Sequence, residues 1–163
     1  MLLTGVSGTG KSSAIVALRQ LGIEAIDTDE DGWRVPPAGP PPHGPAALAE
    51  VQPDWLWDEP RMAALLAAER AGPLVVAGAV ENQGRFLDRF DHVVVLTAPA
   101  ATIDERLRTR TTNPYGRDPD QRARVLAELQ EVEPLMRRHA TRVVDTTLPL
   151  DQVVALLVAD LGA

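Results

Sequence analysis

The chain has 163 residues, a net charge of -7, a pI near 4.9 and no cysteine. Its length fits one α/β domain, residues 1–163, and leaves no room for a second independent domain. The acidic balance argues against nucleic acid as a partner, because binding a phosphate backbone requires a basic stripe. The absence of cysteine excludes disulfides, thiolate metal sites and thiol nucleophiles.

No apolar run approaches the length of a membrane span, and the first motif begins at residue 5. We therefore expect a soluble, cytoplasmic protein that has no signal peptide and no contact with a membrane. Its partner is expected to be a diffusible small molecule. A monomer and a homodimer both remain open.

A phosphate-binding motif lies at the start of the chain. Residues 1–4 predict a short buried strand, and residues 13–18 predict a helix. Between them the spacing is Gly-x4-Gly-Lys-Ser, which places glycines in a strand-to-helix turn so that backbone N–H groups face an anion. The residues expected to bind ATP here are Gly5, Val6, Ser7, Gly8, Thr9, Gly10, Lys11, Ser12 and Ser13.

Two side chains of this motif have individual roles in the prediction. Lys11 is expected to bridge the β- and γ-phosphates, and Ser12 to place its hydroxyl on Mg²⁺. The alternative is a flexible Gly/Ser turn that happens to carry a lysine. The strand and helix on either side favour nucleotide binding.

A pair of acids follows the second predicted strand, residues 23–27. Open parallel sheets bind ligands at the carboxyl ends of their strands. We expect Asp27 to hold Mg²⁺ and Asp29 to accept a proton from, or orient, an attacking hydroxyl. The alternative is a solvated acidic turn that caps a helix. The predicted buried strand at 73–78 ends in Gly78 rather than in an acid, so Asp27 is the leading metal-linked carboxylate.

Further candidates for the acceptor site surround the end of that strand. Gly78 would let backbone approach the substrate. Glu81, Asn82 and Gln83 could bind a base or a sugar hydroxyl through paired hydrogen bonds. A plain turn before a helix at 86–87 is the alternative for these three residues.

The three tryptophans, Trp33, Trp55 and Trp57, lie close together in a chain poor in aromatic residues. They suggest a stacking wall for a ring-bearing acceptor or a base, with core filling as the alternative. Nearby, the proline-rich residues 36–45 predict an extended loop over the cleft, and residues 61–71 predict a helix.

The rest of the chain alternates strands with helices. Apolar runs predict strands, helical spacing predicts helices, and Pro134 is expected to bend or end the longest helix. These elements are strands at 92–97 and 142–145, helices at 101–110 and 120–138, and a closing helix after Pro149. Together they predict a five-stranded parallel sheet covered by helices on both faces.

Arginines gather around a turn-rich insert, residues 111–119. Arg106 and Arg110 lie four apart on the preceding helix, and Arg117 lies in the insert. Arginines on a mobile segment can close over a triphosphate and exclude water, so we expect a lid at about residues 110–120. The alternative is a solvated helix face.

These motifs resemble the small P-loop kinases, a family that includes shikimate, gluconate and adenylate kinases. Gly5 to Ser12 followed by Asp27-x-Asp29 is similar to shikimate kinases, in which the first acid supports Mg²⁺ and the second contacts the accepting hydroxyl. Glu105-Arg106-Leu107-x-x-Arg110 looks like the adenylate kinase helix whose arginines cover adenine and phosphates. The segments at 133–136 and 143–149 resemble the last helix, strand and adenine-side loop, which implies nucleotide contacts for Thr147 and Pro149.

The chain also departs from these relatives. Shikimate kinases carry Gly-Gly-Gly where this chain has Gly78-Ala79-Val80, and their arginine signature is not recognisable near Arg61. Adenylate kinases have an acid-glycine pair at the end of the third strand, which is absent here. Arg61 is nevertheless assigned to the acceptor site, in a substrate subdomain of about residues 30–72.

The resemblance and the motifs together predict a P-loop NTPase fold and an ATP- and Mg²⁺-dependent small-molecule kinase of shikimate- or gluconate-kinase type. Lys11, Asp29, Arg110 and Arg117 are the expected catalytic residues. A nucleoside monophosphate kinase is one alternative. The other is an ATP-controlled binding module without phosphotransfer.

Overall fold

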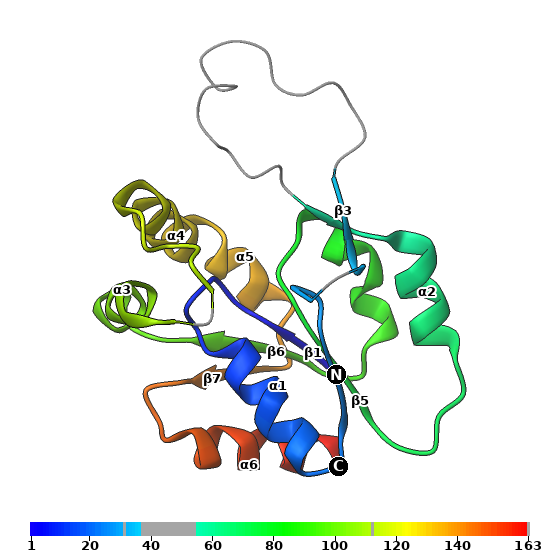
Figure 1. Cartoon of the computed structure of the whole chain (residues 1–163). Helices are drawn as coiled ribbons and strands as arrows, with labels where there is room; N and C mark the ends of the chain where they lie inside the picture. Colours follow the sequence, from blue (N-terminus) through cyan, green and yellow to red (C-terminus); the bar gives the residue numbers. More distant parts are fainter. Residues whose placement is uncertain (31, 37–54, 112, 163) are drawn as a thin grey trace.

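The computed structural model describes residues 1–30, 32–36, 55–111 and 113–162, and its centre is a five-stranded parallel sheet (Figure 1). The strand order is β2-β5-β1-β6-β7. The strands are β1 (Leu2–Thr4), β2 (Glu24–Asp27), β5 (Leu74–Ala77), β6 (Val93–Thr97) and β7 (Arg142–Asp145). The predicted α/β fold with five parallel strands is confirmed. Apart from Pro36, the predicted proline-rich loop lies outside the described residues.

Helices cover both faces of the sheet (Figure 1). On one face, α1 (Lys11–Gln20) and α6 (Leu150–Leu161) pack on a core that includes Leu3 and Val75. On the other, α2 (Glu59–Ala67) and the 3₁₀ helix η2 (Glu81–Arg89) pack on Leu2 and Val76. Neighbouring strand residues thus point to opposite cores, which explains why these strands are apolar throughout. No helix in the described part of the chain is long and apolar enough to cross a membrane.

Three helices form a third layer at the carboxyl end of the sheet. They are α3 (Ala100–Thr109), α4 (Pro119–Glu131) and α5 (Glu133–Arg138). The helix predicted over 120–138 is interrupted at Val132, because Pro134 stands at the start of α5 and has no N–H to continue the hydrogen-bond ladder. The predicted bend or end at Pro134 is confirmed. Ile103, Leu107 and Val125 form a small core here with Val6 of the phosphate loop.

A short antiparallel hairpin was not expected from the sequence. β3 (Arg34–Val35) pairs with β4 (Leu56–Trp57), with Arg34 opposite Trp57. Asp58 then caps α2, because its carboxylate accepts the backbone N–H of Arg61 at 3.0 Å. The hairpin brings two segments that flank the undescribed residues 37–54 against the acceptor side of the sheet.

Candidate active site

The phosphate loop is a tight turn from β1 into α1. Gly5, Gly8 and Gly10 all have positive φ angles. A Cβ atom at Gly5 would lie 2.3 Å from the carbonyl oxygen of Leu96, so no larger residue fits between β1 and β6 there. Within the loop, the Thr9 hydroxyl donates to the carbonyl of Val6 at 2.8 Å. The loop is therefore held by its own contacts and by the neighbouring strand.

The beginning of α1 is suited to an anion. Gly10 is the N-cap and supplies no side-chain hydrogen bond, and the first turn contains no acid. The amides of that turn have no partner inside the helix, so their positive ends face outward beside the exposed Ser12 and Ser13. Residues predicted to contact a triphosphate thus surround one helix N-terminus.

Lys11 points back into the loop. Its Nζ donates to the carbonyl of Gly5 at 2.6 Å and to that of Val6 at 3.0 Å. Burial lowers the pKa of Lys11, while the negative charges of Asp29 and Asp27 act in the opposite direction. The predicted lysine and the predicted acid pair are therefore close enough to influence one another electrostatically.

Arg106 connects three segments that are distant in the sequence. Its guanidinium donates to the Thr146 hydroxyl at 2.8 Å, to the Thr146 carbonyl at 2.6 Å and to the Gly8 carbonyl at 3.4 Å. Thr147 and Pro149 follow in the exposed turn before α6. Arg106 thus ties α3 to the phosphate loop and to the loop predicted to contact adenine.

The insert after α3 folds back against that helix. Arg110 donates to the Tyr115 carbonyl and, at 3.3 Å, to the Ser7 hydroxyl. Burial lowers the pKa of Arg110, and the charge of Asp29 opposes that shift. Arg117 donates to the Arg110 carbonyl at 3.2 Å and its side chain is otherwise exposed. The structure brings Arg110 to the phosphate loop and leaves Arg117 on the insert surface; the lid remains a prediction.

The acid pair lies at the end of β2. Asp27 is buried, and its Oδ1 accepts the backbone N–H of Asp29 at 3.0 Å. Thr28, between them, points inward and is completely buried. Asp29 lies at the cleft, where its Oδ1 is 3.1 Å from Nη2 of Arg34. The two carboxylates therefore differ in exposure, as a division between metal and acceptor requires.

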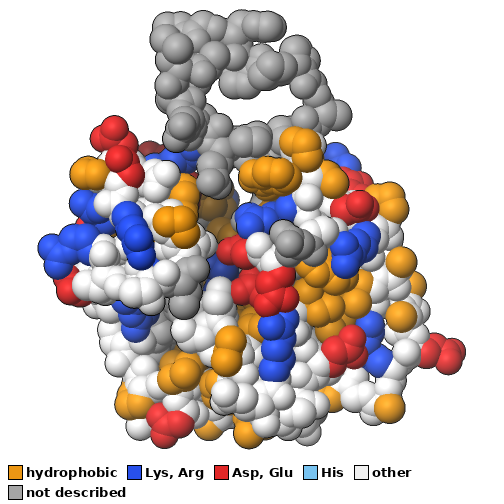
Figure 2. Space-filling model, in the orientation of Figure 1, with side chains coloured by type: hydrophobic (Ala, Val, Ile, Leu, Met, Phe, Trp, Pro, Cys, Tyr) orange, Lys and Arg blue, Asp and Glu red, His pale blue; other side chains and the backbone are white. Residues whose placement is uncertain are grey.

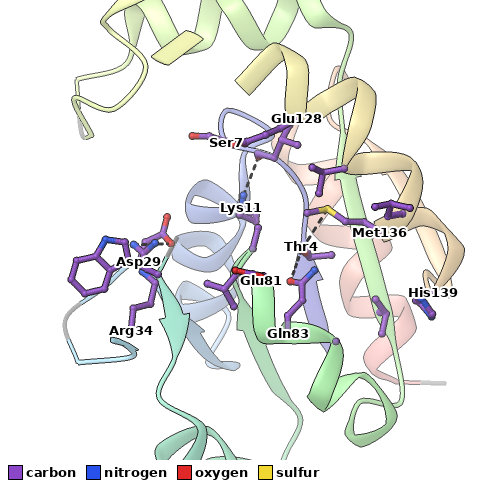
Figure 3. A pocket seen from close by; sticks show the side chains of 18 of the residues that line it. Thr4, Ser7, Lys11, Asp29, Arg34, Glu81, Gln83, Glu128, Met136 and His139 are labelled. Carbon is purple, nitrogen blue, oxygen red and sulfur yellow. Dashed lines mark hydrogen bonds and ion pairs between the residues drawn. The ribbon is translucent and has the colours of Figure 1, made fainter. Parts of the chain in front are cut away.

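A cleft of about 800 Å³ runs along this edge of the sheet (Figure 3). Lys11 and Ser7 lie at one end, Asp29 and Arg34 at the side, and Glu81 and Gln83 along the floor. The Gln83 Oε1 accepts the Thr4 hydroxyl at 3.2 Å, which joins η2 to β1. Glu81 and Gln83, both predicted to bind the acceptor, are within the cleft. They belong to η2 itself rather than to a turn before it.

Three other residues predicted to contact the acceptor build the wall behind it instead. Trp57 is completely buried, and its Nε1 donates to the Thr28 hydroxyl at 3.0 Å. The Asn82 side chain accepts the Trp57 N–H at 2.9 Å and donates to the Trp57 carbonyl at 3.1 Å. A Cβ at Gly78 would lie 2.2 Å from the Thr28 hydroxyl. The roles predicted for Gly78, Trp57 and Asn82 are therefore corrected, because side chains of the protein fill the space assigned to substrate.

The other tryptophans divide between packing and exposure. Arg61 stacks on Trp33, with its guanidinium carbon 4.0 Å from the ring centroid, and donates to the Gly32 carbonyl. Neither residue is among those that line the cleft, so the structure does not bring their predicted acceptor contacts together with Asp29. Trp55, by contrast, lines the cleft and is 37% exposed.

Sequence reasoning missed two cleft residues. Arg34 faces Asp29, and Tyr115 lines the cleft from the insert. A lone tyrosine inside a predicted lid was a usable signal. Nothing in the spacing marked Arg34, because only the hairpin returns it to Asp29.

Comparison with known proteins identifies related folds. A family model described as an AAA domain matches residues 1–133. A shikimate kinase from Bacteroides thetaiotaomicron superposes with a TM-score of 0.63 at 17% identity, covering 99% of this chain and 97% of that one. A shikimate kinase from Acinetobacter baumannii in complex with shikimate gives 0.60 at 16%, covering 98% and 92%. A gluconokinase from Sinorhizobium meliloti 1021 gives 0.57 at 25%, covering 99% and 90%. No curated protein sequence matches the chain.

Proposed function

Since the chain belongs to the AAA domain family and has the fold of the small P-loop kinases, we propose that it transfers the γ-phosphoryl group of ATP to a hydroxyl group of a small molecule. The observation that carries the proposal is that Lys11 and Asp29 line one cleft at the carboxyl edge of the sheet. A phosphate-binding lysine and an exposed carboxylate on either side of one space are what transfer between two substrates requires.

The nucleotide side is proposed to hold ATP through the loop and α3. Backbone amides at the start of α1 bind phosphate oxygens, and Lys11 exchanges its hydrogen bonds to the Gly5 and Val6 carbonyls for bonds to the β- and γ-phosphates. Arg110, next to Ser7, neutralises charge on the transferred group. Arg106, Thr147 and Pro149 face the adenine.

Mg²⁺ fits the donors at this end of the cleft. Among the described residues, no three His, Cys, Asp or Glu side chains gather into a cluster able to hold a metal. Magnesium in phosphotransfer sites needs only one or two protein oxygens, because phosphates and water supply the rest. Ser12 and Asp27 would supply these oxygens; within the described chain, only one oxygen of Asp27 accepts a hydrogen bond. The ion would neutralise charge on the phosphates.

Asp29 is proposed to act on the acceptor. The acceptor oxygen forms a bond to the γ-phosphorus while the bond from that phosphorus to the β–γ bridging oxygen breaks. The hydroxyl proton passes to the Asp29 carboxylate. Arg34, at 3.1 Å, holds that carboxylate in position. The products are ADP and a phosphate ester.

Two variants test this division of labour. Lys11→Ala should lower turnover by about 10²- to 10³-fold, because it removes a donor to the transferred group, with the fold retained by circular dichroism. Asp29→Asn should lower turnover and leave the ATP dissociation constant within about twofold, as calorimetry would measure. Asp91→Asn, an exposed acid outside the cleft, is the matched control.

The results also separate the alternatives. An equal loss of ATP binding in Asp29→Asn would contradict its assignment to the acceptor. ATP binding without any phosphorylated product, together with indifference to Asp29→Asn, would indicate a nucleotide-controlled binding module. ADP formed from ATP and AMP would indicate a nucleoside monophosphate kinase.

A further inference from the structure

The charges around the acceptor part of the cleft restrict what can bind there. The chain has 16 lysine and arginine residues, and none of them is among the residues left undescribed, which are Asp31, residues 37–54, Thr112 and Ala163. Every strong cation of the protein therefore has a known position. Those that line the cleft are Lys11, Arg34 and Arg124.

Each of these cations already faces oxygen atoms. Lys11 lies at the nucleotide end, bonded to loop carbonyls. Arg34 is 3.1 Å from Asp29, and Nε of Arg124 is 3.4 Å from Oε1 of Glu128. An anionic acceptor would have to displace one of these carboxylates from its arginine. It would gain no cation that is waiting for it.

Glu81 adds a negative charge at the centre of the cleft. Its side chain is exposed and lies between Lys11 and Gln83 in Figure 3. Within the described part of the chain it makes no hydrogen bond or ion pair. A free carboxylate repels an anion and attracts an O–H or N–H donor, above all a cationic one. This end of the cleft therefore disfavours carboxylates and phosphates.

Beyond Gln83 the cleft continues between η2 and the α4–α5 junction, and there its walls are apolar. Leu87 lies on η2, and Val132, Leu135 and Met136 face it from the junction and α5. Val132 is 36% exposed and Leu135 is 51% exposed. Exposed apolar side chains that line a cleft favour an apolar part of a ligand.

We propose, on the premise of the proposed function, that the acceptor is an alcohol without an anionic group, neutral or positively charged, that carries an apolar arm. Its hydroxyl lies at Asp29, a donor group faces Glu81, and the arm occupies the channel beside Leu87 and Leu135. Shikimate, the carboxylate bound in one structural neighbour, lacks both properties.

The test works on an acceptor whose identity is still open. A bacterial metabolite extract is passed over a strong anion exchanger, and the flow-through and the bound fraction are each incubated with protein, Mg²⁺ and ATP labelled in the γ-phosphate. The labelled product is expected from the flow-through, in a subfraction that a reversed-phase column retains. Each fraction without protein is the control.

The failures are distinguishable. A product from the anion-bound fraction would leave phosphotransfer standing and overturn the proposed acceptor class. A product from the flow-through that the reversed-phase column does not retain would overturn the apolar arm. No product from either fraction would overturn the proposed function, and the inference with it.

Variants locate the selectivity once a product is found. Glu81→Gln should raise KM for the acceptor about tenfold and leave KM for ATP unchanged, because a charge-assisted hydrogen bond becomes a neutral one. Glu69→Gln, an exposed acid outside the cleft, should change neither value. Leu135→Asn should raise KM for the acceptor, whereas Leu21→Asn, also on the surface, should not. An unchanged acceptor KM in Glu81→Gln would overturn the role of its charge.

Discussion

The phosphate loop and the wall of the acceptor site are held together in different ways. In the loop, the internal contacts join near neighbours: Thr9 to Val6, and Lys11 to Gly5. In the wall, Trp57 meets Thr28 and Asn82, which are 29 and 25 residues away. The loop is therefore a local structure, whereas the wall forms only when the hairpin, β2 and η2 come together.

The difference shows where specificity can change. Loop contacts involve backbone atoms and glycines, so few other residues fit. The wall places a buried layer behind an exposed one, because Trp57 packs under the surface that carries Asp29 and Glu81. The face of the two acids is mixed in charge rather than basic, as red and blue side chains alternate in Figure 2, and Arg19 pairs with Glu30 at 2.8 Å.

The largest expected effect tests the buried layer. Trp57→Ala should lower the free energy of unfolding by about 3–5 kcal/mol, because it empties the core between α2 and η2. Trp55→Ala, at a position 37% exposed, should change it by at most about 0.5 kcal/mol. Urea unfolding of both variants measures the contrast. Similar losses in the two would mean that the wall has no buried layer.

A smaller effect is expected at Gly78. Gly78→Ala should cost about 1–3 kcal/mol of stability, because the new methyl group would overlap the Thr28 hydroxyl and press on the Trp57 ring. Gly84→Ala is the matched control, since nothing lies within 4 Å of a Cβ there. If both substitutions are equally neutral under thermal unfolding, close packing at the end of β5 is not what requires the glycine.

The smallest effect concerns the loop. Lys11 is the chain's single lysine, and burial lowers its pKa, so it should react with acetic anhydride at a lower pH than free Nα-acetyl-lysine does. Between the lowered pKa and the usual lysine range, the unfolded chain binds more protons than the folded chain, so stability should rise with pH in that window. Mass spectrometry of the labelled peptide follows the titration.

ATP with Mg²⁺ supplies the control for that experiment. Phosphates favour the charged amine, so the titration of Lys11 should move back to higher pH and labelling should slow. A titration that coincides with that of the free amine, with no response to ATP, would contradict the burial of Lys11 in the loop.

Much of the fold followed from local patterns. Apolar runs located four of the five sheet strands, the short strand before the loop was found from its context, and Pro134 marked the break between α4 and α5. The hairpin was missed because β3 and β4 have only two residues each, too few to show a period. In the candidate site, Lys11, Asp29, Glu81 and Gln83 were placed together correctly at one cleft.

The errors share one cause. Trp57, Asn82 and Gly78 were assigned to substrate because their chemistry suits binding, yet Trp57 and Asn82 satisfy one another's hydrogen bonds and Gly78 admits Thr28. Composition shows that a polar or aromatic group is present. It does not show whether that group faces a ligand or another part of the chain.

The sequence by itself determined the parallel sheet and the phosphate loop, because hydrophobic periodicity and glycine spacing act over short stretches of chain. Only the tertiary structure decided which acceptor residues face the cleft, and that Arg34 meets Asp29 while Glu81 has no partner among the described residues. Those relations join residues that are distant along the chain. Their burial and charge depend on how strands, hairpin and helices pack, which no local pattern records.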